Sequence, residues 1–200
     1  MMVKRAAQSY AGFWAVWTLA SAAGFTFGGM MSLSVAFGLG QVAMEATNET
    51  IGFAVTGALF GIFVGGGLGT GQQVVLKLKT GWGSLWSWAS ALATAIVWAI
   101  AFPLYIAAGG PASSPAGAII VVLFGLALGV GQWLVLRNHL LGVGRWITVT
   151  TVSLALALGL ALILGGEGQE LLSIGAAGLL AGALTGLGMT WLLRDSAATD

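Results

Sequence analysis

Between Lys79 and Arg137 the chain reads TGWGSLWSWASALATAIVWAIAFPLYIAAGGPASSPAGAIIVVLFGLALGVGQWLVL, without one charged side chain. The Gly- and Pro-rich segment GGPASSP divides this stretch into two apolar runs. Each run has the roughly 20 residues that a helix needs to cross a bilayer core of about 30 Å. Strands of a membrane β-barrel would instead show short alternating segments. The stretch therefore predicts a pair of helices that span a membrane.

The whole chain has the same apolar character. Of its 200 residues, 58% are hydrophobic and 6% are charged, and the mean hydropathy is +0.98. Soluble domains carry about 25% charged residues, and a nucleic-acid-binding domain needs a basic face. The composition thus excludes a soluble enzyme, a disordered tail and a nucleic-acid binder. The lack of cysteine also excludes disulfides, thiolate catalysis and iron–sulfur clusters.

Six apolar runs are long enough to span a bilayer as helices. We therefore expect an all-α membrane protein with six transmembrane helices in a single domain, residues 1–200. The expected spans are residues 13–38, 51–76, 85–108, 117–136, 146–164 and 171–193.

The few charges sort to two sides when the spans alternate across the membrane. All basic residues fall on one side, namely Lys4, Arg5, Lys77, Lys79, Arg137, Arg145 and Arg194. The four glutamates, Glu45, Glu49, Glu167 and Glu170, fall on the other side. The positive-inside rule then predicts both termini in the cytoplasm.

Tryptophan follows the basic residues along the sequence. Eight of the nine tryptophans fall near the basic ends of the spans, which predicts a tryptophan belt at that interface. A cleavable signal peptide is an alternative for the first span, because Lys4 and Arg5 precede an apolar run and the triplet Ala20-Ser21-Ala22. The internal repeat described next requires the first helix to stay in place.

The basic ends of the even-numbered spans share one pattern. It reads GTGQQVVLK at 69–77, GVGQWLVLR at 129–137 and GLGMTWLLR at 186–194, with shifts of 60 and 57 positions. The odd-numbered spans share a Trp followed four residues later by a hydroxyl, in the pairs Trp14/Thr18, Trp86/Ser90 and Trp146/Thr150. These agreements predict three repeated helical hairpins at about 11–79, 80–140 and 141–195, arranged around an axis along the membrane normal.

The first hairpin is longer than the other two. Its extra residues fall around 35–50, so we expect the longest external connection there, as an interfacial segment.

The repeated segment resembles runs in uncharacterised multi-pass bacterial membrane proteins that contain recurrent Gly-x-Gly-Gln-Trp-x-x-Leu-Arg hairpins. The third copy departs from this pattern, because Met189 stands at the position of the glutamine. The resemblance implies a multi-pass helical fold and a place in the inner membrane of a bacterium, and it carries no activity with it.

Glycine recurs at every fourth residue on the even-numbered spans. Such spacing places the glycines on one helix face, where a neighbouring helix can approach closely. One interpretation is packing within the bundle, and the other is a face for a second protein or a groove for a lipid or pigment ring. The predicted helix-packing residues are Gly57, Gly61, Gly65, Gly69, Gly125, Gly129, Gly178, Gly182 and Gly186.

Polar side chains near the basic ends are candidate ligand or pore contacts. Gln72 and Gln132 occupy equivalent positions, and hydrogen bonds to Ser90 or Thr150 would satisfy their amides. The alternative is a polar constriction or a substrate contact. Trp98 is a further candidate contact, because Pro103 one turn later can break the helix and open a pocket.

The apolar spans lack the side chains that enzymatic catalysis usually needs. General acid–base catalysis needs a titratable group near the reacting atom, and no carboxylate, histidine or lysine falls inside the spans. His139, the sole histidine, lies in a loop beside Arg137. We therefore predict no catalytic residue, no metal site and no cofactor.

Two functions remain. The first is a non-catalytic structural or accessory subunit that packs against a larger membrane complex or against itself, in contact with membrane lipids and with a lipid or pigment as an optional ligand. The second is a transporter, channel or substrate-binding membrane subunit for a small uncharged or apolar solute. A roomy or polar axis lined by Gln72, Gln132 and Trp98 favours the second, and a dry, glycine-packed axis favours the first.

Overall fold

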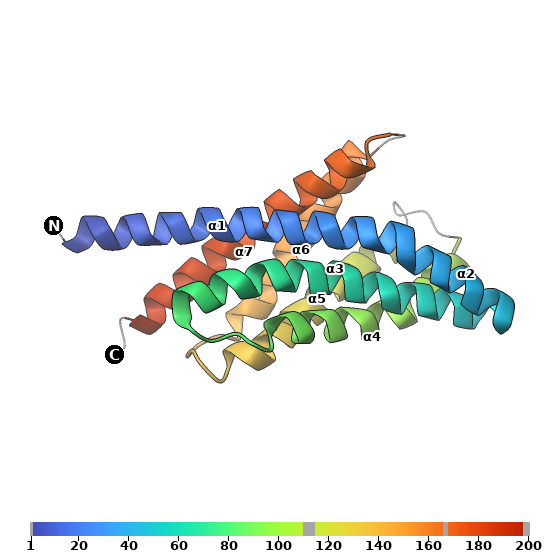
Figure 1. Ribbon diagram of the computed structural model, residues 1–200, viewed down its shortest axis with the longest axis horizontal. Coiled ribbons are helices and arrows are strands. Elements are labelled where there is room, and N and C mark those ends of the chain that lie inside the picture. The colour runs from blue at the N-terminus through green and yellow to red at the C-terminus, as the bar shows by residue number, and fades with distance from the viewer. Residues whose placement is uncertain (1, 110–114, 166–167, 198–200) are drawn as a thin grey trace.

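The computed structural model describes residues 2–109, 115–165 and 168–197, and within these ranges the regular structure is helical throughout (Figure 1). Six of the helical segments are long and apolar enough to cross a membrane, as the sequence predicts. The elements are α1 (Met2–Met31), η1 (Ser32–Ala36), α2 (Phe37–Ala46), α3 (Glu49–Thr80), α4 (Trp86–Ala107), α5 (Pro115–Leu136), α6 (Arg145–Leu164) and α7 (Glu170–Ala197).

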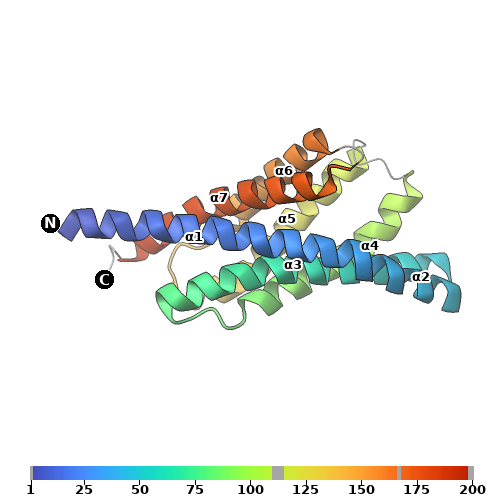
Figure 2. The same ribbon diagram turned by 45° about the horizontal axis from the view of Figure 1, so that its top comes forward.

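The six long helices form a closed ring. Each helix packs against the next in the order α1, α3, α4, α5, α6 and α7, and α7 packs back against α1. Figure 2 shows α1 lying between α3 and α7. The ring has an axis that all six helices surround, and the buried side chains along this axis form the core.

The first hairpin differs from the sequence-based expectation. The segment around 35–50 is not a long external connection, because α1 continues through η1, one π-helical turn, into α2 and ends at Ala46. Only Thr47 and Asn48 separate α2 from α3, and the Asn48 side chain accepts a hydrogen bond from the backbone N–H of Ile51 at 3.0 Å. The extra residues therefore lengthen both helices of the hairpin.

Close backbone contact stabilises this helical extension. Gly40 on α2 lies against Thr56, and Gly52 on α3 lies against Met44, so that the two helices have no room for a side chain at either glycine. The packing of α2 on α3 explains why the helix does not end where the bilayer-length rule places its end.

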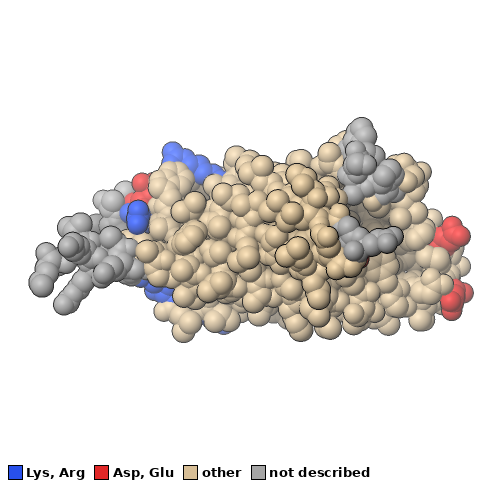
Figure 3. All heavy atoms as spheres, turned by 90° about the horizontal axis from the view of Figure 1, so that it is seen from above, with Lys and Arg blue, Asp and Glu red and all other residues tan. Residues whose placement is uncertain are grey.

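Charged side chains gather at the two ends of the bundle. Figure 3 shows Lys and Arg at one end and acidic side chains at the opposite end, with a further acidic group among the basic ones. The chain termini lie at the basic end (Figure 1). Glu167 falls outside the described residues. The long, uncharged middle of the bundle is the part that a bilayer would cover.

Candidate functional site

Three buried tryptophans meet on the axis near the basic end. Trp17 from α1, Trp86 from α4 and Trp146 from α6 are each 0% exposed. Their ring centroids lie 6.2 Å apart for Trp17 and Trp86, 6.3 Å for Trp17 and Trp146, and 5.8 Å for Trp86 and Trp146. Edge-to-face and tilted contacts at such distances are the favoured geometries of aromatic pairs. We call these residues the tryptophan triad.

Each indole N–H of the triad donates to a side chain on the preceding helix of the ring. Trp86 Nε1 donates to Gln72 Oε1 at 3.0 Å, and Trp146 Nε1 donates to Gln132 Oε1 at the same distance. Trp17 Nε1 donates to Thr185 Oγ1 on α7 at 3.1 Å. The triad is thereby bonded to three helices that contribute no ring to it.

The two glutamines connect the triad into one hydrogen-bonded network. Gln132 Nε2 donates to Gln72 Oε1 at 2.9 Å and to Ser90 Oγ at 3.1 Å. Gln72 Nε2 donates to Ser21 Oγ at 3.3 Å. Both amides are buried, at 1% and 0% exposed, so the network satisfies groups that water cannot reach.

Met189, which the sequence pattern aligns with Gln72 and Gln132, is buried in one cluster with Trp17 and Trp146. Thr150, which the sequence suggests as a glutamine partner, is buried, and its hydroxyl has no hydrogen-bond partner among the described residues. Ser90 forms the expected bond, and Thr150 does not.

Two expectations about tryptophan need correction. Trp17, and not Trp14, meets Trp86 and Trp146, whereas the Trp14 N–H donates to the carbonyl of Ala183 at 2.9 Å. The triad is buried core and not part of an interfacial belt. Other tryptophans do lie at the basic end beside charged groups, since Arg137 lies over Trp133 and Arg145 over Trp191.

The predicted helix-packing glycines lie where one helix meets the next around the ring. An added Cβ on Gly61 would lie 2.6 Å from the backbone nitrogen of Ala95, so α3 and α4 touch through their backbones. An added Cβ on Gly182 of α7 would lie 2.7 Å from the carbonyl oxygen of Thr18 on α1. The glycine faces are covered by the chain itself: Gly57, Gly61, Gly65 and Gly69 face α4, Gly125 and Gly129 face α6, and Gly178, Gly182 and Gly186 face α1.

A second set of glycines, which is not among the predicted helix-packing residues, packs α1 against α3. Gly24 and Gly28 lie against Gly67 and Phe63, and Gly71 lies against Ala20. The signal was present in the sequence, since both pairs, Gly24/Gly28 and Gly67/Gly71, have the spacing of four.

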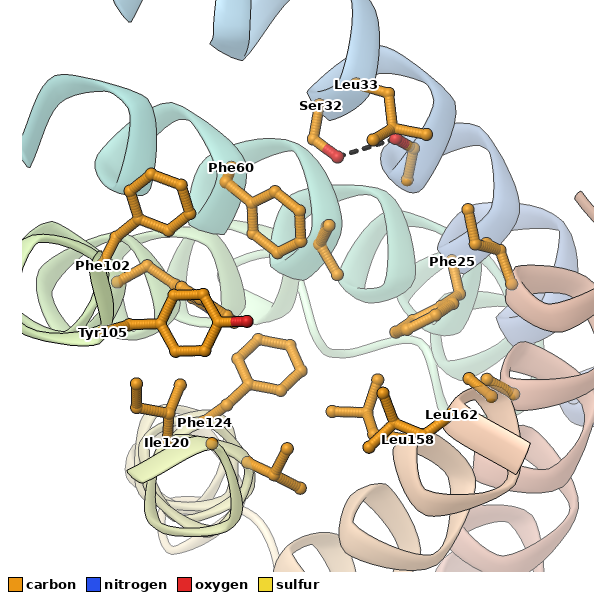
Figure 4. A pocket seen from close by; sticks show the side chains of 18 residues that line it. Phe25, Ser32, Leu33, Phe60, Phe102, Tyr105, Ile120, Phe124, Leu158 and Leu162 are labelled. Atoms are coloured by element: carbon orange, nitrogen blue, oxygen red, sulfur yellow. Dashed lines mark hydrogen bonds between the residues drawn. The ribbon is translucent and has the colours of Figure 1, made fainter. Parts of the chain in front are cut away.

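Beyond the triad, toward the acidic end, the axis widens into a cavity of about 350 Å³. Residues of α1, η1, α3, α4, α5, α6 and α7 line it, and those labelled in Figure 4 come from all of these elements except α7. Trp98 is one of the lining residues, as its place before Pro103 predicts, and Gln72 and Gln132 are not. We call this space the axial cavity.

The lining of the axial cavity is almost wholly apolar. Figure 4 shows the hydroxyl of Tyr105 pointing into the space between Phe60 and Phe124. Ser32, the other hydroxyl residue of the lining, donates to the carbonyl of Gly29 at 2.7 Å. None of the described lining residues is Asp, Glu, His, Lys or Arg. Such a cavity suits a hydrocarbon-rich ligand with few polar atoms.

Metal-ligating residues do not cluster in the part of the chain that the structure describes, where no three of His, Cys, Asp and Glu come together. His139 stacks on Trp82 with ring centroids 4.5 Å apart, so its ring packs between two loops at the basic end. Comparison with protein families, curated proteins and solved structures finds no match to this chain.

Proposed function

We propose that this chain is a non-catalytic multi-pass membrane protein that binds an apolar ligand inside its helical ring and serves as an accessory subunit of a larger membrane complex. The axial cavity carries the proposal. It lies on the axis, it is lined by all six long helices, and the tryptophan triad fills the axis beyond it. A ligand in such a cavity is retained and has no continuous path through the protein.

An empty apolar cavity destabilises a protein, because the side chains that line it lose dispersion contacts. Water does not fill such a cavity favourably, since the lining offers it few hydrogen-bond partners. At about 350 Å³ the cavity falls within the range of about 300–1,000 Å³ that small-molecule sites occupy. Apolar molecules of the surrounding bilayer are available to fill it.

The proposal includes three repeated hairpins around the axis. In support, Trp86 follows Gln72, and Trp146 follows Gln132, by the same 14 residues, and both pairs form the same hydrogen bond. Thr185 replaces the glutamine at the closing contact with Trp17. On this view Met189 marks the copy that has diverged.

The proposed setting is the inner membrane of a bacterium, with both termini in the cytoplasm. The clustering of basic side chains at the end that carries the termini supports this orientation under the positive-inside rule (Figure 3). The lipid-facing surface, with residues such as Leu92, Ile96 and Ile100 more than half exposed, is available to lipids and to other subunits.

Ligand retention is tested by filling the cavity. Ala161 lines the cavity on α6, so Ala161→Phe occupies ligand space, whereas Leu156→Phe adds bulk to the lipid-facing side of the same helix. Native mass spectrometry of the full chain, purified in mild detergent, should show a retained apolar molecule in the wild type and in Leu156→Phe, and less of it in Ala161→Phe. Equal retention in all three would refute the proposed binding site.

The accessory role is tested by the same purification. We expect another membrane protein to remain bound to the wild-type chain in mild detergent. Recovery of the chain as a lone, stable monomer would contradict the accessory role and leave ligand binding standing.

A transporter for a small uncharged or apolar solute is the second candidate, because the cavity lies on the axis of the ring. Transport would require the triad to separate during each cycle, since its rings fill the axis. Uptake into proteoliposomes that falls with both Trp98→Ala and Gln132→Leu would favour this candidate. Unchanged uptake in these variants would exclude it.

A further inference from the structure

We infer that the ligand of the axial cavity is a quinone-type molecule, with a flat carbonyl-bearing ring in the cavity and a hydrocarbon tail that leaves between α4 and α5. The inference rests on the proposed ligand-binding function and names its chemical class. Three features carry it: the aromatic lining, the unpaired hydroxyl of Tyr105, and a lipid-facing groove that adjoins the cavity.

Aromatic side chains are concentrated in the lining. They make up six of its 18 residues, against 10% of the chain as a whole. An acyl chain needs only apolar surface, which Leu, Ile and Val supply equally well. A flat conjugated ring gains further from edge-to-face and offset stacking on aromatic neighbours. The aromatic lining residues are Phe25, Phe60, Trp98, Phe102, Tyr105 and Phe124.

Tyr105 supplies a hydrogen-bond donor to this aromatic lining, and the buried Nε1 of Trp98, which has no partner among the described residues, is a second. Its ring stacks on Phe102 with centroids 6.4 Å apart, and its hydroxyl points into the cavity (Figure 4). The hydroxyl forms no hydrogen bond with the described residues of the chain, which leaves it free to donate to a ligand oxygen. A carbonyl oxygen on a ring accepts such a bond without bringing a donor of its own.

A second space adjoins the cavity on the side of the bilayer. A groove of about 320 Å³ between α4 and α5 shares Tyr105 and Ile120 with the axial cavity. Its other walls face the lipid, since Leu104 is 63% exposed and Ile119 is 60% exposed. We call it the lateral groove. A ligand with its ring beside Tyr105 can therefore run its tail along this groove into the membrane.

The arrangement also accounts for the place of Pro103. Proline cannot donate to the carbonyl four residues earlier, so the last turn of α4 is held less firmly to the rest of the helix. That turn carries Tyr105, which together with Ile120 on α5 lines both spaces and so forms the boundary between the axial cavity and the lateral groove. A ligand entering from the bilayer has to pass this boundary.

The test compares two probes of equal chain length on the full chain in nanodiscs, an alkyl benzoquinone and an alkylbenzene, with binding followed by quenching of tryptophan fluorescence and by equilibrium dialysis. Both carry a flat ring and a tail, but only the quinone has carbonyl oxygens. We expect the quinone to bind about fivefold more tightly, the effect of one hydrogen bond of about 1 kcal/mol.

Tyr105→Phe should weaken this preference and leave alkylbenzene affinity unchanged, because phenylalanine keeps the ring and removes the hydroxyl, whereas the Nε1 of Trp98 stays in the lining as a second donor without a partner among the described residues. Tyr10→Phe is the matched control, since Tyr10 is the only other tyrosine and lies beside Arg194 at the basic end. It should keep the fivefold preference.

The outcomes separate the two claims. Equal affinity for both probes, unchanged in Tyr105→Phe, overturns the quinone assignment while ligand binding stands. A phospholipid retained in native mass spectra that excess quinone does not displace overturns it in favour of an acyl chain. Binding of neither probe, together with equal ligand retention in Ala161→Phe and the wild type, overturns the proposed function itself.

Discussion

The indole N–H of Trp146 donates to the side-chain oxygen of Gln132 at 3.0 Å, and neither residue is accessible to solvent. The same amide also donates to Gln72 and Ser90, so one side chain bonds three helices at the level of the triad. In an apolar interior the alternative to these bonds is an unpaired polar group. The network therefore fixes the relative positions of the helices at the basic end.

Gln132→Leu should destabilise the bundle by about 2 kcal/mol, because it removes three interhelical hydrogen bonds worth about 0.6 kcal/mol each in membrane proteins. Unfolding in a graded mixture of mild and denaturing detergent measures the change. Gln41→Leu is the control, since Gln41 bonds only Glu45 on the exposed surface of α2. Similar stability of the two variants would show that the network contributes nothing.

Met189→Gln should stabilise the bundle by about 1 kcal/mol, because the new amide can pair with the Thr150 hydroxyl, which now has no partner among the described residues. Met189→Leu, which keeps the volume and adds no polar group, should leave stability nearly unchanged. The prediction depends on the proposed repeat. A lower melting temperature for Met189→Gln than for Met189→Leu would count against threefold equivalence.

Gly61→Ala should destabilise the protein by about 1–3 kcal/mol, as overpacking does in close-packed cores. The new methyl group would meet the backbone of Thr94 and Ala95 and push α4 away from α3. Gly66 is the matched control on the same helix, since its added Cβ would only touch the Ala91 side chain at 3.4 Å. Gly66→Ala should be neutral or gain up to about 1 kcal/mol from helix propensity. Thermal unfolding in detergent distinguishes the two variants.

The proposed orientation can be read with single cysteines, because the chain contains none of its own. Glu49→Cys places a thiol at the acidic end, and Ser84→Cys places one in the exposed loop at the basic end. A membrane-impermeant maleimide applied to intact spheroplasts should label Glu49→Cys and leave Ser84→Cys unlabelled. The reverse pattern would place the termini outside.

The sequence predicts the helical spans well, because the length of an apolar run is set directly by bilayer thickness. The same rule fails for the first hairpin, where α2 continues to Ala46 because Gly40 and Gly52 let it pack on α3. Helix contacts that extend past the apolar run cannot be read from hydropathy. Ser90, the hydrogen-bond partner of Gln132, was predictable because a hydroxyl residue recurs four positions after a tryptophan on the odd-numbered spans.

The choice between Trp14 and Trp17 was not predictable from spacing. The two residues are three positions apart and share much of one helix face, so only packing against α7 decides which of them reaches the axis. The axial cavity was also not predictable from the sequence pattern, because its size and place depend on how the six helices are arranged in space. Trp98 and Pro103 pointed toward it, whereas the aromatic side chains from α1, α3 and α5 gave no separate signal.

The contact between α1 and α7 has a consequence for biogenesis. Trp17 near one end of the chain donates its N–H to Thr185, 168 residues later. During synthesis the first helix enters the bilayer long before α7 exists. Until then the surface of Thr18 and Ala22, on which Gly182 and Gly178 of α7 pack in the folded protein, faces lipid or a chaperone. Ring closure is therefore the last assembly step, and a chain halted before α7 presents the insertion machinery with an open, incompletely bonded helix bundle.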